Sequence, residues 1–598
     1  MDNGIAKDLS VSQTRDVTGS IDLAASDQLE RGLKSRHIQF IALGGAIGTG
    51  LFVGSGGILS TVGPAPLFMA YITMIFVVWV VMNDLAEMAT YLPLKGISVP
   101  YFVERFVEPS LAFADGWNYW YAYAILVAAE ATAGAIVLQY WTKAVPVAVW
   151  ITIVSIGLQA HVRQTSELTL PQILLSILAL NIFAVSIFGE AEFWAASIKL
   201  ITIIGLRFVS LLIDARVTYS SQPLQVVLSI VLFFGGGPSH DSLGFRYWSP
   251  HNPGAFAPYL ASSTTTTATS HFLAYWTATI RAGFAFILSP ELLAVAAGEA
   301  IAPRRNLPKA ARRYIYRLAL FYGFGSLAIG ILVPHNDSRL LSPDSNASAS
   351  PFVIGIQNAG IHGLNHAINA AILTSAWSAG NAFLYSGSRT LYSLSLSHQV
   401  PRIFSRTTSR GVPFAAVLAT WLVTCLAYLN VSNSGAKVFI WFSNISTISE
   451  FIAWIVAMIT YLRFRKAMQC KGLLKGLPYR TPLQPYATYF ALGLVTILTL
   501  TNGFPVFFPA NWNISDFLAA YITLPVFLVL YLGHKTWSSL RRVENTQESS
   551  WKGGFWSFAR KVEDIDVLTG KREMDEMEAQ DIPPVPRNWV EKVWFWLA

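Results

Sequence analysis

Charged residues and cysteines are both scarce in this chain of 598 residues. Only 13% of the residues are charged, about half the share in an average soluble domain. The two cysteines, Cys425 and Cys470, are too few for a disulfide framework. No Walker A pattern occurs, and no His/Cys group has metal-ligand spacing. These absences argue against an ATP-driven pump, and we expect no metal, no cofactor and no enzymatic activity.

Apolar residues, by contrast, make up 53% of the chain and recur in long runs. A membrane-spanning helix needs about 20 of them. The runs lie at roughly 38–60, 66–92, 113–142, 145–188, 193–213, 270–298, 312–334, 358–394, 412–430, 437–462, 486–509 and 514–534. We therefore expect an all-α polytopic membrane protein with about twelve transmembrane helices. The net charge of +8 comes from basic residues in short loops, which does not indicate nucleic-acid binding.

The loops between the apolar runs alternate between basic and non-basic. Basic loops are expected on the cytosolic side, and here they precede the first run and follow the second and sixth. This pattern places residues 1–36 and 535–598 in the cytosol as two tails and 37–534 in the membrane domain. Residues 238–269, with their Gly/Pro clusters, are expected to form a long outside loop.

A glycine-rich stretch, 43–52, lies in the middle of the first apolar run. Glycine weakens a helix by about 1 kcal/mol relative to alanine. A helix unwound in the bilayer requires protein or a water-filled cavity around its freed backbone groups, so this stretch is a candidate binding site. The same spacing also fits close packing of helices through small residues.

Several motifs together resemble the fungal amino-acid permeases of the amino acid–polyamine–organocation superfamily. They include the opening at 31–52, Gly116-Trp117-Asn118-Tyr119-Trp120, the run 198–205, the stretch from Glu291 to Glu299 and Asp564-Ile565-Asp566. The resemblance covers roughly residues 31–580. It implies a five-plus-five inverted repeat, of the leucine-transporter type, in which broken helices 1 and 6 hold the substrate.

Two polar stretches, 154–180 and 207–227, interrupt spans that are continuous in the family pattern. Our hypothesis is that both are retained introns in the gene model. Sequencing of the mature transcript tests this, and finding both stretches there would refute it.

Helix 1 is expected to bind both charged ends of the substrate. The ammonium group of an amino acid needs hydrogen-bond acceptors, and its carboxylate needs donors. We expect the carbonyls that end the first half-helix to bind the ammonium and the N–H groups that begin the second to bind the carboxylate. The residues concerned are Gly45, Ala46, Ile47, Gly48, Thr49 and Gly50.

In helix 6, Pro290 disfavours helix at Ser289, which predicts either a break or a simple kink. Ser289 is a candidate substrate contact. Phe284 and Phe286 are candidates for an aromatic gate over the substrate, or for apolar packing.

Three of the ionisable residues inside expected spans, Lys199, Glu130 and Glu291, are candidates for function. Charged groups at membrane depth are candidates for function, although structural pairing or snorkelling at a helix end also accommodates them. By resemblance, a helix-5 lysine takes the place of a sodium ion, so Lys199 is the leading proton-coupling residue, with Glu130 and Glu291 beside it.

Taken together, the sequence predicts a plasma-membrane importer of amino acids that works by proton symport and alternating access. Its expected partners are the amino acid, protons, membrane lipid and the trafficking and ubiquitination machinery at its tails. The alternative is a sensor of permease fold that binds amino acids without moving them.

Overall fold

The computed structural model describes residues 48–93, 98–138, 141, 232–235, 241–250, 252–260, 265–287, 290–291, 303–340, 350–360, 364–408, 411–431, 435–508, 511–544, 556–571, 575–576 and 588. This part of the chain is helical and contains no strand. The two interrupting stretches, 154–180 and 207–227, lie outside the described residues, as do Gly45, Ala46, Ile47, Lys199 and Ser289.

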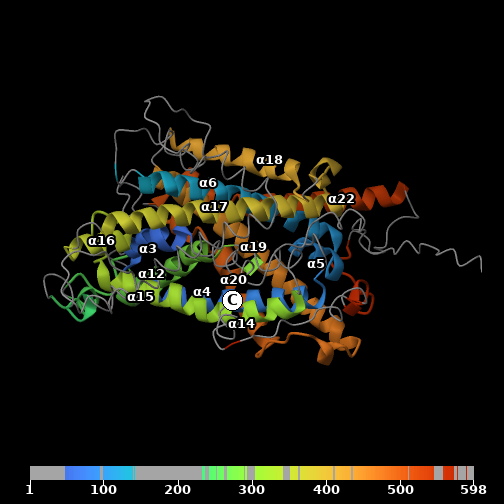
Figure 1. Ribbon diagram of the computed structural model, residues 1–598, viewed down its shortest axis with the longest axis horizontal. Coiled ribbons are helices and arrows are strands. Elements are labelled where there is room, and N and C mark those ends of the chain that lie inside the picture. Colours follow the sequence, from blue (N-terminus) through green and yellow to red (C-terminus); the bar gives the residue numbers. More distant parts are fainter. Residues whose placement is uncertain are drawn as a thin grey trace, which may run out of the picture.

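The helices form two groups that lie against each other (Figure 1). The first group surrounds α6 and the second surrounds α4, while α19 touches both. The first comprises α6 (Pro109–Leu138), α17 (Leu364–Leu396), α18 (Phe414–Val423) and α22 (Thr523–Glu544). The second comprises α4 (Pro64–Tyr91), α12 (Thr267–Ala282), α14 (Pro303–Leu318), α15 (Phe324–Leu332) and α20 (Tyr486–Leu500). The long α19 runs from Gly435 to Cys470.

Shorter elements connect or extend these helices. They are η1 (Gly50–Gly54), α3 (Ser55–Val62), α5 (Val99–Phe106), η2 (Arg246–Trp248), η3 (Gly283–Phe286), η4 (Ala319–Gly323), α16 (Pro351–Asn358), η5 (Arg402–Ser405), η6 (Thr424–Val431), η7 (Leu474–Gly476), η8 (Phe504–Phe507) and α21 (Ile514–Tyr521).

Local sequence explains where several helices begin. Pro64 occupies the first turn of α4, where its missing N–H costs no hydrogen bond. The hydroxyl of Thr266 caps α12 by accepting a hydrogen bond from the Thr269 N–H at 3.2 Å. The side chain of Asn513 caps α21 in the same way.

Burial distinguishes the centre of the bundle from its lipid-facing edge. In α6, 94% of the most apolar window is buried, whereas the figure for the helix that begins at Tyr486 is 33%. A helix that is apolar all round and buried belongs to the core. The exposed side chains of α20 include Phe490 and Leu500, and those of α22 include Val529. These apolar faces fit contact with lipid.

Five helices among the described residues are long and apolar enough to cross a membrane, and a bent pair, Ile514–Tyr521 with Thr523–Leu540, makes up to six. Each overlaps an expected span, although Pro303–Leu332 begins nine residues before its expected start and the helix that ends at Cys470 runs eight residues past its expected end. The all-α architecture is thus confirmed in the described chain, whereas the count of twelve and the inverted repeat stay predictions.

Candidate functional site

The glycine-rich stretch enters the described chain at Gly48 and departs from regular α-helix. Residues 50–54 form η1, a turn of π-helix, before α3 begins at Ser55. A π-turn widens the backbone and leaves some of its groups without regular partners, and such turns are frequent at functional sites. Thr49, at the start of this segment, is fully buried, and its hydroxyl has no hydrogen-bond partner among the described residues.

The second irregular segment follows α12. The helix tightens into the 3-10 turn η3 and then ends, because Ile287 has an extended backbone with ψ of 134°. The chain is helical again at Pro290 and Glu291. Helical geometry is therefore lost at Ile287, three residues before the proline. The missing N–H of Pro290 and the clash of its ring with the carbonyl four residues earlier, that of Phe286, fit a break here.

The two irregular segments touch at a point where only glycine fits. A Cβ on Gly50 would lie 2.7 Å from the Cα of Ala285, which is closer than real Cβ atoms come to backbone. A third irregular segment, η4, joins them, because the Tyr322 hydroxyl donates a hydrogen bond to the carbonyl of Ala285 at 2.9 Å. Three helices thus depart from α-geometry at one place in the bundle.

A buried carboxyl group closes the same place from α6. Oε1 of Glu130 accepts a hydrogen bond from the Thr49 N–H at 3.4 Å, and Glu130 is only 3% exposed. A Cβ on Gly48 would lie 2.6 Å from that oxygen. The structure therefore brings together Gly48, Thr49, Gly50 and Glu130, which the sequence analysis named separately.

The two phenylalanines of η3 have different surroundings. Phe286 is fully buried against Tyr322 and Tyr71, with ring centroids 4.4 and 5.7 Å away. Phe284 is 7% exposed and meets the edge of Phe439, with centroids 5.4 Å apart. Phe286 is thus part of a packed aromatic group, and Phe284 lies beside Gly54 of η1.

Glu291 lies apart from Glu130 and nearer the start of α6. The hydroxyl of Tyr119 donates a hydrogen bond to its Oε1 at 3.3 Å. Two further buried acids in this neighbourhood, Asp115 and Glu450, are absent from our sequence-based candidates. Glu450 is an acid inside an expected span, so the rule that selected Glu130 also selects it.

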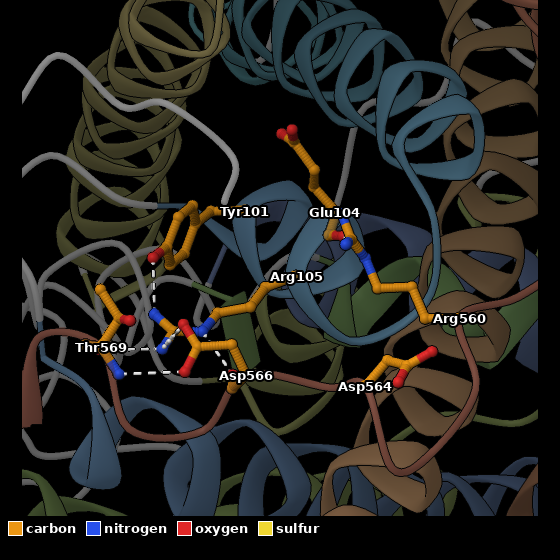
Figure 2. A pocket seen from close by; sticks show the side chains of 7 residues that line it. All are labelled: Tyr101, Glu104, Arg105, Arg560, Asp564, Asp566 and Thr569. Carbon is orange, nitrogen blue, oxygen red and sulfur yellow. Dashed lines mark hydrogen bonds and ion pairs between the residues drawn. The ribbon is translucent and has the colours of Figure 1, made fainter. Parts of the chain in front are cut away.

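A second candidate region lies where the C-terminal tail meets α5. Figure 2 shows a small cavity lined by Tyr101, Glu104, Arg105, Arg560, Asp564, Asp566 and Thr569. Arg105 is its centre: one guanidinium nitrogen pairs with the Asp566 carboxylate at 3.1 Å, and the same nitrogen donates to the carbonyl of Thr569 at 2.8 Å. Asp564-Ile565-Asp566, found in the sequence only as a motif, is therefore an anchor for the tail.

Other contacts spread this anchor across several helix ends. The Tyr91 hydroxyl, at the end of α4, donates to the carbonyl of Val567 at 2.9 Å. Lys471, just after α19, donates to the carbonyl of Ile565 at 2.6 Å. Ile565 and Val567 are fully buried. Residues 556–571 thus pack as part of the fold, which the expectation of a charged cytosolic tail did not include.

Two carboxyl groups of this region have opposite pKa shifts. Burial raises the pKa of Glu104 to about 7, against the weaker effects of Arg560 and the Gln399 side chain. Burial also acts on Asp566, but the charge of Arg105 and the N–H groups that Asp566 accepts from outweigh it, so the pKa of Asp566 is lowered. Near neutral pH, Asp566 is therefore ionised, whereas Glu104 titrates.

The fold and these sites define a class: a polytopic helical membrane protein whose helices lose regular geometry around buried carboxyl groups. Residues 37–547 match the family model described as amino acid permease. Because this match spans most of the sequence, the chain belongs to the amino acid permease family. Members of this family are transporters rather than enzymes.

Fungal relatives match over nearly the whole chain. The chain is 51% identical to a proline-specific permease of Emericella nidulans, over 95% of this chain and 93% of that one. It is 51% identical to a probable proline-specific permease of Schizosaccharomyces pombe, over 93% and 90%. It is 45% identical to a proline-specific permease of Saccharomyces cerevisiae, over 93% and 82%.

The crowding at Gly48 predicts a strong effect from a single methyl group. We expect Gly48→Ala to lower amino-acid uptake about tenfold at unchanged surface expression, since overpacking of this kind costs about 1–3 kcal/mol. Gly493→Ala in α20 is the control, because its added Cβ meets nothing within 4 Å. Uptake of labelled amino acid in permease-deficient yeast measures both, and equal uptake by the two variants would contradict the close contact.

The raised pKa of Glu104 predicts a pH-dependent stability. The pKa of Glu104 is about 7 in the folded state, against 4.5 for an unperturbed glutamate. The folded state therefore holds this proton more tightly, and its stability falls as pH rises from about 5 to 7. Glu104→Gln removes this titration, so its melting temperature in detergent should depend less on pH than that of the wild type. The exposed Glu563→Gln is the control, and parallel pH profiles for wild type and Glu104→Gln would contradict the assignment.

Proposed function

We propose that this chain imports L-proline across the plasma membrane together with a proton. The observation that carries the proposal is the meeting of η1, η3 and η4 beside Glu130, where backbone groups and a buried hydroxyl face one another. Backbone unwound at membrane depth occurs where it is buried in protein or lines a cavity, and it is the usual ligand shell of secondary transporters.

The substrate's two charged ends determine how it lies in this site. A half-helix that begins near Gly50 directs its free N–H groups toward a carboxylate, and the Thr49 hydroxyl adds a donor. The secondary ammonium of proline has two N–H donors, which need two acceptors. The carbonyls of Gly45, Ala46 and Ile47 are the acceptors that we propose. Ser289, the residue before Pro290, is a further proposed substrate contact.

The choice of proline rests on the relatives and on the apolar side of the site. Three fungal relatives at 45–51% identity are named for proline specificity. The proline ring is small and apolar, and it can pack on an aromatic face. Phe284, beside Gly54, offers such a face and serves as the gate in this proposal. Phe286 supports it from the packed aromatic group.

Proton coupling completes the mechanism. Lys199 is the proposed coupling residue on helix 5. Glu130, on α6, and Glu291, which follows Pro290 and meets Tyr119 of α6, are the further proposed proton-coupling residues. A lysine enclosed by protein loses its proton more readily than one in water, which suits a residue that alternates between states. Transport then proceeds by alternating access around the fixed site, in a five-plus-five repeat with both termini in the cytosol.

A non-transporting sensor is the alternative. The relatives named above are permeases, so nothing in the comparisons favours it. The two functions differ in one measurable respect: a sensor binds proline without accumulating it.

Uptake in permease-deficient yeast tests the proposal. We expect labelled L-proline to accumulate against its gradient, faster at about pH 5 than at about pH 7, with an uncoupler abolishing the accumulation. Competition by an excess of each other unlabelled amino acid defines specificity. Saturable binding without accumulation would support the sensor, and accumulation that ignores the uncoupler would reject proton symport.

A further inference from the structure

Three fully buried carboxyl groups, Asp115, Glu291 and Glu450, share one neighbourhood between the helix groups. They come from three separate segments: the first turns of α6, the helical residues after Pro290, and the middle of α19. All three act electrostatically on Tyr119, and Glu291 interacts with both of the other two. Asn118 joins the same two helices by donating to the carbonyl of Ser449 at 2.9 Å.

Asp115 is the unusual member of this carboxyl cluster. It is 0% exposed, and neither of its carboxyl oxygens has a hydrogen-bond partner among the described residues. The indole Nε1 of the fully buried Trp454 approaches Glu291 without a hydrogen bond of ordinary geometry. Within the described chain, no Lys or Arg forms an ion pair with Asp115 or Glu291. The cluster therefore contains buried carboxyl oxygens, those of Asp115, that a ligand could satisfy.

Ionisation of all three groups would place three negative charges together away from water. Neighbouring negative charges repel one another, and burial disfavours the ionised form of each carboxyl group separately. Each bound proton removes one negative charge and turns one carboxylate oxygen into an O–H donor. An unpartnered oxygen of a neighbouring carboxyl group can accept a hydrogen bond from this O–H. A proton is thus the smallest ligand that satisfies the charge and the missing hydrogen bonds at once.

We propose that Asp115, Glu291 and Glu450 form a proton-binding site through which the permease releases its coupled proton toward the cytosol. The inference rests on proton symport in the proposed function and adds to it the residues and the side of release.

The position of the cluster supports its assignment to the cytosolic side. Asp115 lies near the start of α6, which follows directly on α5 and its contact with the C-terminal tail. Glu130 lies further along the same helix, about 22 Å away at 1.5 Å per residue. Tyr119 and Tyr123 line the interval, and both interact electrostatically with Glu291.

The broken helix connects this cluster to the substrate. Phe284 and Ala285 contact η1 on one side of the break, and Glu291 lies on the other side in the cluster. A displacement of η3 on substrate binding is therefore expected to move Glu291, which follows η3 by five residues, relative to Asp115 and Glu450. Proton affinity of the cluster then depends on substrate occupancy without direct contact between the two ligands.

Counterflow of labelled proline in proteoliposomes tests the proposal, with equal pH on both sides and scanned from about pH 5 to 8. Asp115→Asn removes a negative neighbour of Glu291, so the remaining carboxyls lose their proton more easily. We expect its pH midpoint to move toward acid by about one unit, and Glu450→Gln to move it in the same direction. The control is Asp84→Asn, a buried acid of α4 whose carboxyl is already held by Gln484 and Thr488; its midpoint should match the wild type.

A measurement on the wild type keeps the test independent of how the variants fold. The infrared band of protonated carboxyls should be present in the purified permease at neutral pH and should weaken as pH rises. Absence of the band, or midpoints for both cluster variants equal to the wild type, overturns the proposal. If the pH midpoint moves when sodium is replaced by choline, the cluster binds sodium, and the proposal of a proton site is overturned. Wild-type transport without any response to pH or uncoupler would instead reject proton symport itself.

Discussion

The contact of the Gly48–Gly50 backbone with Glu130 and Ala285 is the constraint on which the centre of this molecule depends. Any side chain at Gly48 or Gly50 would collide with these neighbours at 2.6 or 2.7 Å. The backbone can therefore come within hydrogen-bonding reach of a buried carboxyl from α6, and η1 can press against the end of η3. In an ordinary α-helix at either place, the backbone N–H and C=O groups would bond to each other within the helix.

The position of polar groups along α6 gives the bundle its functional axis. This helix is apolar over most of its surface and almost wholly buried, yet it carries Asp115, Tyr119 and Glu130. Polar groups inside such a helix are costly unless another element satisfies them. Glu130 accepts a hydrogen bond from the Thr49 N–H, next to the π-turn η1, and Tyr119 donates one to Glu291, which follows η3 and Pro290. In both cases, irregular backbone and buried charge occur together, each accommodating the other.

Sequence alone predicts the helices well and their meeting points poorly. The apolar runs place α4, α6 and the start of α19 within a few residues, because a membrane-spanning helix needs a length and a hydrophobicity that can be read from the sequence. Glycine density and Pro290 likewise predict the irregular segments η1 and η3. The hydrogen bond from Thr49 to Glu130 joins residues far apart in the chain, and no periodicity reports such a pair. The same holds for Tyr322 and Ala285, whose partnership depends on how η4 approaches η3.

The tail shows why composition can mislead about order. Its charge predicts a solvated segment, yet residues 556–571 are held mainly through their own backbone carbonyls. Side chains of the membrane domain, including Tyr91, Arg105 and Lys471, supply the donors. A backbone acceptor is present whatever the side chain, so most of the tail's sequence is free to vary without loss of these bonds.

What the sequence must retain is the pair of buried residues, Ile565 and Val567, and the carboxylate between them that meets Arg105. The motif Asp564-Ile565-Asp566 therefore supplies one of the two buried apolar side chains and the carboxylate that pairs with Arg105, and Val567 follows it with the second.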